Sequence, residues 1–258
     1  YCSQDLHSGQ KSEANEWGLY FSGHFIQEAI MAELDDKLSV ASDILVTGAS
    51  AGGLGVWMML DWVAKKYPQA RVTGISVAGL YFFATYYTGP HATGPGGMAD
   101  FREAAFPNTV ALWDAYLDES CVAAFPEPAG CMLLNNSLPY IDSDIFVVQA
   151  QTDQVVLEGH DCFPGDPYMG EPEEKQFLEL WHHNMSVALE PIIHQKTVSA
   201  GGRDRKLGAF AAACYTHTNF TASHPLIQGV NFFKAVHNLL RLKLKRGLSI
   251  SNSQYGTL

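Results

Sequence analysis

Positive charge is scarce in this chain, and no apolar run in it is long. Its 258 residues include 16 Lys and Arg against 27 Asp and Glu, a formal net charge of −11 at pH 7. Nucleic-acid binding needs clustered cations that displace counterions from phosphates, so this balance argues against a nucleic-acid partner. No segment approaches the roughly 20 consecutive apolar residues that cross a bilayer, so we predict no membrane span.

Metal and redox motifs are also missing. The sequence contains no CxxC pair and no HExxH motif, so we expect neither a metal nor another cofactor. Its cysteines and N-glycosylation sequons instead favour a secreted, extracellular protein of the cell wall or surface. Because the cysteine count is odd, one thiol lacks a partner, and Cys2 is the natural candidate. The cysteines are Cys2, Cys121, Cys131, Cys162 and Cys214, and sequons begin at Asn135, Asn184 and Asn219.

The spacing of apolar residues predicts alternating helices and strands. Residues 21–38 and 54–66 have the pattern of helices, and residues 43–47 and 71–77 have that of buried strands. This rhythm is typical of an α/β fold, a mostly parallel central sheet with helices on both faces. No linker divides the chain, so we predict one domain over residues 1–258. Farther along, we predict a strand over 144–149, helices over 108–117, 173–189 and 226–245, and loops over 89–97 and 200–206.

The turn after the first strand carries a motif for nucleophilic catalysis. Gly48-Ala49-Ser50-Ala51-Gly52 matches G-x-S-x-G between a predicted strand and a predicted helix. Small flanking residues permit the sharp turn that lifts a serine hydroxyl above the sheet edge in α/β-hydrolase folds. The helix that follows would aim the backbone N–H groups of Ala51 and Gly52 at an oxyanion. The alternative is a glycine-rich turn in which the serine only caps the helix.

A serine nucleophile needs a general base and a carboxylate that orients that base. In the α/β-hydrolase class these residues follow the serine in the order acid, then histidine. Asp153 lies shortly after the 144–149 strand, at the sheet edge where ligands bind, and His217 lies later in a loop-like stretch. Spacing alone leaves rivals, which are Asp142, Asp144 and Asp161 for the acid and His160, His182, His183 and His224 for the base.

Four collinear segments extend the pattern. They are Tyr1-Cys2-Ser3-Gln4-Asp5 with Ser8-Gly9, the serine turn with Gly53, Phe146-Val147-Val148-Gln149 with Asp153, and Cys214-Tyr215-Thr216-His217. Over nearly the whole chain they resemble the pectin acetylesterase family, which includes the Notum carboxylesterases. The resemblance implies a secreted α/β-hydrolase without a metal, with Ser50 as nucleophile, Asp153 as orienting acid and His217 as general base. It also implies a disulfide between Cys121 and Cys131, and we take Cys162–Cys214 as a second pair.

The chain departs from the family pattern in two places. Relatives carry an upstream Gly-Gly-Gly-Trp-type turn that supplies oxyanion donors, and losing such a donor costs roughly 10²–10³ in turnover. This sequence starts at Tyr1, with neither an initiator Met nor a signal peptide. We therefore expect it to lack that turn and the early strands, and to begin inside a longer precursor. The second departure is the stretch Ser76-Val77-Ala78-Gly79, where relatives usually have an Asp before the small residues.

These observations favour a serine carboxylic-ester hydrolase. The leading hypothesis is a pectin acetylesterase-like O-deacetylase of acetylated polysaccharide. One alternative is a Notum-like deacylase that removes a fatty acyl group from an acylated protein, for which a long apolar tunnel would be diagnostic. The other is a non-catalytic relative that binds a glycan or acyl ligand, although such a protein has no need of all three triad residues. The apolar stretch Leu80-Tyr81-Phe82-Phe83 and Trp113 could line an acyl pocket, but we interpret them as core.

Overall fold

The fold is organised around a parallel sheet. The computed structural model describes residues 8–82, 84–94, 102–165, 170–193, 202, 204–220, 224–241 and 249–251. Its five strands lie in chain order, and every neighbouring pair is parallel. The α/β class predicted from the sequence is thereby confirmed. The strands are β1 (Asp43–Ala49), β2 (Arg71–Val77), β3 (Asp144–Asp153), β4 (Leu207–Thr216) and β5 (Ser249–Ser251).

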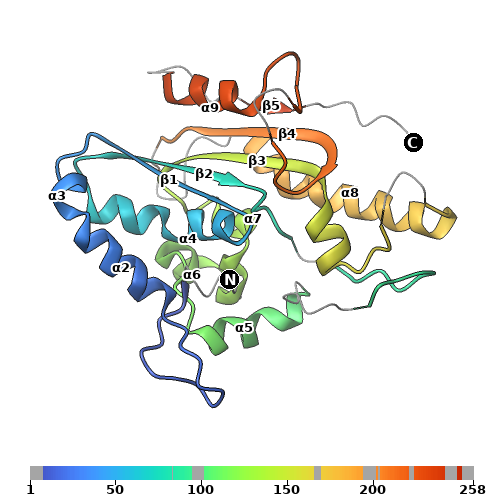
Figure 1. Cartoon of the computed structure of the whole chain (residues 1–258), viewed down its shortest axis with the longest axis horizontal. Coiled ribbons are helices and arrows are strands. Elements are labelled where there is room, and N and C mark those ends of the chain that lie inside the picture. The colour runs from blue at the N-terminus through green and yellow to red at the C-terminus, as the bar shows by residue number, and fades with distance from the viewer. Residues whose placement is uncertain are drawn as a thin grey trace.

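Helices cover both faces of this sheet (Figure 1). On one face, α4 packs on β1 and β2 while α8 packs on β3 and β4, and α9 lies across β3 and β4 on the other face. The helices are α2 (Gly23–Glu33), α3 (Asp35–Leu38), α4 (Ala51–Lys66), α5 (Phe106–Trp113), α6 (Glu119–Ala124), α7 (Leu134–Ser137), α8 (Pro172–Ile193) and α9 (Phe232–Arg241). Shorter turns are η1 (Glu103–Ala105), η2 (Pro128–Met132) and the π-helical η3 (Val155–His160). None of the helices in the described residues is both long and apolar enough to cross a bilayer.

The elements near the centre of the sheet have strongly apolar sequences because they are buried. Strand β3 is buried on both faces from Ile145 to Asp153, because α8 and α9 cover its two sides. Helix α4 is apolar around most of its circumference, since it lies between the sheet and the short helices α7 and η2. The indole of Trp57 in α4 donates to the carbonyl of Met132 at 3.3 Å. Leu80, Tyr81, Phe82 and Trp113 are buried in the same core, as interpreted from the sequence.

Several elements differ from their predicted bounds. The predicted 21–38 helix is interrupted at Leu34, which separates α2 from α3. Helix α5 ends before Asp114, whose left-handed φ of 51° stops the predicted 108–117 helix early. Strand β4 was not predicted, and the predicted 226–245 helix begins only at Phe232 because Ile227 and Val230 form a bridge before it. Parts of the predicted loops 89–97 and 200–206 and of the predicted 226–245 helix lie outside the described residues, at 95–97, 200, 201, 203 and 242–245.

One of the two expected disulfides is present. Cys121 and Cys131 are bonded, with their Cα atoms 6.0 Å apart, which confirms that pair. Cys162 and Cys214 are not disulfide-bonded, so the second pairing was wrong. The sheet separates them, because Cys214 packs against the cluster under α9 whereas Phe163, next to Cys162, belongs to the core on the other face. Cys2 lies outside the described residues.

Candidate active site

The predicted site residues lie at one edge of the sheet. Since the strands are parallel, their carboxyl ends meet at the same edge, which is where α/β folds place their ligands. Ser50 follows β1, Asp153 is the last residue of β3, and His217 follows β4. The pairing of Asp153 with Thr216 brings the ends of β3 and β4 level, so that His217 begins beside the carboxylate.

Ser50 occupies a strained backbone conformation. Its φ of 57° and ψ of −122° are unusual for a residue with a side chain. Its N–H donates to the carbonyl of Val77 at 2.9 Å, and its own carbonyl accepts from Leu54 in α4 at 3.1 Å. The turn is therefore fixed to β2 on one side and to the helix on the other. This is the strand-to-helix geometry of a nucleophile elbow.

Glycines make the turn possible because backbones approach each other closely around it. A Cβ atom at Gly48 would lie 2.3 Å from the carbonyl oxygen of Gly52, and one at Gly53 would lie 2.7 Å from that of Val77. A Cβ at Gly79 would lie 2.5 Å from the carbonyl carbon of Gly53. Any larger residue at these positions would push α4 away from the strands and move Ser50.

Ser76 also supports the turn. Its buried hydroxyl donates to the carbonyl of Gly53 at 2.9 Å and so ties the end of β2 to the first turn of α4. This bond helps to hold the strand-to-helix turn that carries Ser50 in place.

Helix α4 begins at Ala51, immediately after Ser50. The first N–H groups of a helix have no acceptor within the helix, and its dipole favours negative charge at this end. Ala51 itself is buried, so a substrate oxygen beside its N–H would be shielded from water. The N–H groups of Ala51 and Gly52 therefore have the setting that an oxyanion site requires.

Asp153 and His217 form a close pair. His217 Nδ1 lies 2.9 Å from Oδ1 and 2.9 Å from Oδ2 of Asp153, so that Nδ1–H donates to the carboxylate. Asp153 is completely buried, and the backbone N–H groups of Val155 and Val156 donate to its Oδ1 at 3.0 and 3.1 Å. The other ring nitrogen of His217, Nε2, is buried and has no hydrogen-bond partner among the described residues. That nitrogen is the one available to act as a base.

Comparison with known proteins places the chain in a family. Residues 1–248 match the model of the family described as Pectinacetylesterase. The chain belongs to the pectinacetylesterase family. This finding confirms the resemblance seen in the sequence.

Two named relatives illustrate the range of this family. The chain is 28% identical to the palmitoleoyl-protein carboxylesterase NOTUM of Homo sapiens over 249 residues, which are 92% of this chain and 47% of that protein. It is 32% identical to pectin acetylesterase 4 of Arabidopsis thaliana over 233 residues, 86% of this chain and 54% of that protein. The chain thus spans about half the length of the curated relatives it matches.

Four of the rival residues lie elsewhere or are engaged in other contacts. Asp142 and Asp144 lie at the amino end of β3, at the opposite edge of the sheet from the Ser50 turn. Asp161, beyond η3, accepts a bond from the indole of Trp181. His182, interpreted from the sequence as a surface residue with His183, is instead half-buried, and its Nε2 lies 3.0 Å from Oγ1 of Thr152. Burial lowers the pKa of His182, which favours the neutral ring.

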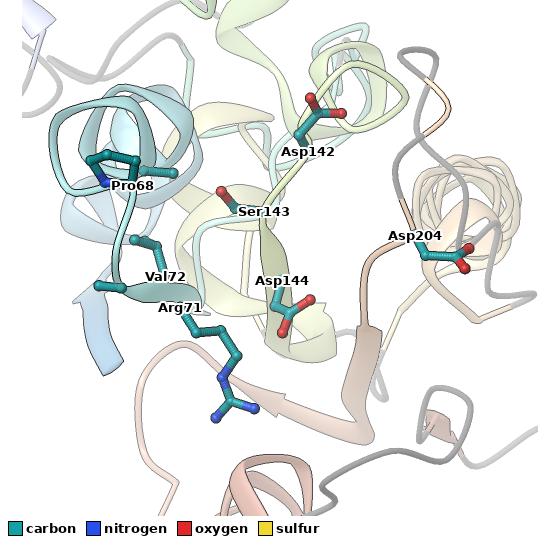
Figure 2. Close-up of a pocket in the computed structure, with 9 residues that line it drawn as sticks. Pro68, Arg71, Val72, Asp142, Ser143, Asp144 and Asp204 are labelled. Carbon is teal, nitrogen blue, oxygen red and sulfur yellow. The ribbon is translucent and has the colours of Figure 1, made fainter. Parts of the chain in front are cut away.

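A cavity of about 300 Å³ lies at the far end of the strands, close to the starts of β2 and β3. Figure 2 shows its lining residues. Two of its charged side chains already have partners, since Arg71 pairs with Asp43 at 3.0 Å and Asp144 accepts from the N–H of Lys206 at 2.7 Å. Ser50, Asp153 and His217 do not line it. No three His, Cys, Asp or Glu side chains in the described part of the chain are grouped as metal ligands.

Sequence reasoning missed one polar residue of the site. Gln149 is fully buried in β3, and its Nε2 donates to Asp153 Oδ2 at 2.8 Å. The signal was a glutamine directly after the apolar run Ile145–Val148 of a buried strand, where a polar side chain needs a specific partner.

Proposed function

We propose that this protein is a carboxylic ester hydrolase with Ser50 as nucleophile, His217 as general base and Asp153 as orienting acid. The observation that carries the proposal is the bond from His217 to the buried Asp153, at the same sheet edge as the strained Ser50 turn. A single catalytic domain would hold all three. Membership of the pectinacetylesterase family supports the same chemistry.

The proposed reaction proceeds through an acyl-enzyme. His217 Nε2 takes the proton of Ser50 Oγ as the hydroxyl attacks the ester carbonyl. The N–H groups of Ala51 and Gly52 donate to the resulting oxyanion. The alcohol leaves with the proton from His217, and water activated by the same nitrogen then hydrolyses the acyl-serine. Buried donors hold both oxygens of Asp153 and so fix the orientation of its carboxylate toward His217.

We infer that the substrate is an acetylated, pectin-like polysaccharide. The support is the likeness to a relative named as a pectin acetylesterase, together with the family match. We also infer that the protein acts outside the cell, since the Cys121–Cys131 bond is stable in an oxidising compartment.

One observation favours the second candidate, removal of a fatty acyl group from a protein. An apolar groove of about 340 Å³ borders the turn and includes Gly48 and Gly52. Its walls come from Ile30 and Met31 of α2 and from Met59 of α4. An acetyl group would leave most of such a groove empty, whereas a longer acyl chain would bury apolar surface there.

Ester hydrolysis by the full-length protein tests both candidates. We expect p-nitrophenyl acetate to be the best of a series from acetate to octanoate, and acetylated pectin to release acetate. An optimum at octanoate, with activity on a palmitoleoylated peptide, would select the second candidate. We expect Ser50→Ala to lower turnover at least about 10³-fold, while the control Ser12→Ala, at an exposed serine, has no effect. A protein inert toward every ester would overturn the proposal and favour a binding role.

A further inference from the structure

Gln149 uses both ends of its amide within the core. Its Nε2 donates to Asp153 Oδ2 at 2.8 Å, and its Oε1 accepts from the backbone N–H of Leu80 at 3.0 Å. The orientation of the amide is determined by these partners, because a backbone N–H only donates and a carboxylate only accepts. The side chain is completely buried, so water does not compete for either bond.

The strand itself brings Gln149 within reach of the acid. The two residues are four positions apart on β3, and the pairing of β3 with β4 shifts register between Ala150 and Thr152. The extra residue lies in the partner strand, since Ala150 and Thr152 of β3 pair with Ala212 and Tyr215 of β4. The amide of Gln149 meets the carboxylate of Asp153 although both belong to one strand.

The donors to Asp153 are divided between its two oxygens. Val155 and Val156 donate to Oδ1 from the backbone, whereas Gln149 donates to Oδ2. Without the Gln149 amide, His217 would be the remaining donor to Oδ2 among the described residues. A buried carboxylate with fewer donors holds its charge less well and can rotate.

The other hydrogen bond of Gln149, to the N–H of Leu80, joins it to a segment that packs beside the Ser50 turn. Leu80 follows Gly79, whose backbone packs against Gly53 in the first turn of α4. A single side chain thus connects the carboxylate of Asp153 to the segment that supports the Ser50 turn.

We propose that Gln149 is a positioning residue for the ester hydrolysis. It keeps Asp153 aligned with His217 Nδ1, and it fixes the acid relative to the Ser50 turn through Leu80. This inference rests on the proposed function and goes beyond it, because it assigns a role to a residue outside the triad.

The test compares two neighbouring buried glutamines of β3. Gln149→Met removes the donor to Asp153, while Gln151→Met is the matched control, since the Gln151 amide donates to the carbonyl of Ala211 at 2.9 Å and not to the acid. We expect Gln149→Met to lower kcat about 10–100-fold with little change in KM. Loss of the donor makes the surroundings of His217 more negative, so the acidic limb of the kcat/KM profile should move to higher pH by about one unit. Gln151→Met should leave that limb unchanged.

A second variant provides the same test with less disturbance of packing. Gln149→Glu has nearly the same shape and retains an oxygen for the Leu80 N–H. It places a second carboxyl group against Asp153, and two buried carboxyl groups this close cannot both ionise. The introduced group therefore keeps a proton that it can donate to Asp153 Oδ2, so we expect the acidic limb to move less than in Gln149→Met. The imidazole Nδ1–H resonance of His217 in proton NMR should shift more in Gln149→Met than in Gln149→Glu, because it reports on the bond to Asp153.

The outcomes separate this inference from the proposed function. Activity retained in Ser50→Ala would overturn the proposed function. If Ser50→Ala is inactive but folded Gln149→Met and Gln149→Glu keep the parental limb, the positioning role is overturned and the esterase proposal stands. Equal displacement of the limb in Gln151→Met would also overturn it, because it would mark a general packing effect.

Discussion

Trp181 of α8 donates its indole N–H to Asp161 at 2.6 Å, and both side chains are buried. The other carboxyl oxygen of Asp161, Oδ1, has no hydrogen-bond partner among the described residues. Burial therefore raises the pKa of Asp161 from 3.8 to about 7, and the Trp181 bond only partly opposes this rise. A carboxyl group just beyond the proposed catalytic acid thus gains a proton on folding over a wide pH range.

This relationship predicts a pH-dependent stability. Because the folded pKa of Asp161 lies above the unfolded value, its stabilising contribution is complete below pH 3.8 and is lost as pH rises through about 7. Asp161→Asn cannot ionise but retains an acceptor for Trp181. We expect this variant to unfold with a free energy similar to the parent at pH 4, and higher by roughly 1–4 kcal/mol at pH 8. Urea unfolding at both pH values measures the difference, and an equal difference at both would contradict the prediction.

His24 predicts a slope of the opposite sign. It is buried, stacks on Tyr116 with ring centroids 4.2 Å apart, and has Trp62 at its edge. Burial lowers the pKa of His24, with Glu28 partly opposing, so its contribution to stability is present above the unfolded value of 6.5 and is lost as pH falls. We expect His24→Phe, which keeps an aromatic ring there, to flatten the decline in melting temperature between pH 6.5 and 5. The exposed His183→Phe is the control and should leave the decline unchanged.

Much of the fold could be predicted because its signals are local. The β-branched run of β2 had the predicted bounds, and the predicted 54–66 helix lies within α4. Strand β4 was missed because its Leu207–Thr216 sequence is rich in alanine, which strands seldom favour. Strand β4 lies between β3 and β5, where its small side chains can be buried. That position is visible only in the tertiary structure.

The candidate site also has one part that the sequence could predict and another that it could not. The Ser50 turn is a contiguous motif, so its backbone form follows from nearby residues. Asp153 and His217 are 64 positions apart and come together only because β3 and β4 pair in a particular register. Sequence spacing therefore could not exclude the other candidate acids and histidines. The partners of Gln149 come from β3 itself and from the Leu80 segment, and that meeting also depends on tertiary structure.

Glycine at position 53 is predicted to be essential to the turn. A Cβ atom there would lie 2.7 Å from the carbonyl oxygen of Val77, a backbone atom that cannot move without β2. We expect Gly53→Ala to destabilise the protein by about 2–4 kcal/mol and to reduce esterase activity, because α4 and Ser50 are displaced. Gly74→Ala is the matched control, since its Cβ would meet side-chain methyl groups of Leu60 and Val56 that can rotate. A smaller loss in Gly53→Ala than in Gly74→Ala would contradict this account.

The Cys121–Cys131 bond predicts a response to reductant. It closes a short loop of sequence separation 10, and removing the cross-link frees chain entropy in the unfolded state. We expect dithiothreitol to lower the free energy of unfolding by roughly 2–3 kcal/mol. The double variant Cys121→Ser/Cys131→Ser should show this lower stability without reductant and should not respond to it further, because Cys162 and Cys214 form no disulfide. A further loss of stability on reduction of that variant would instead reveal a second disulfide.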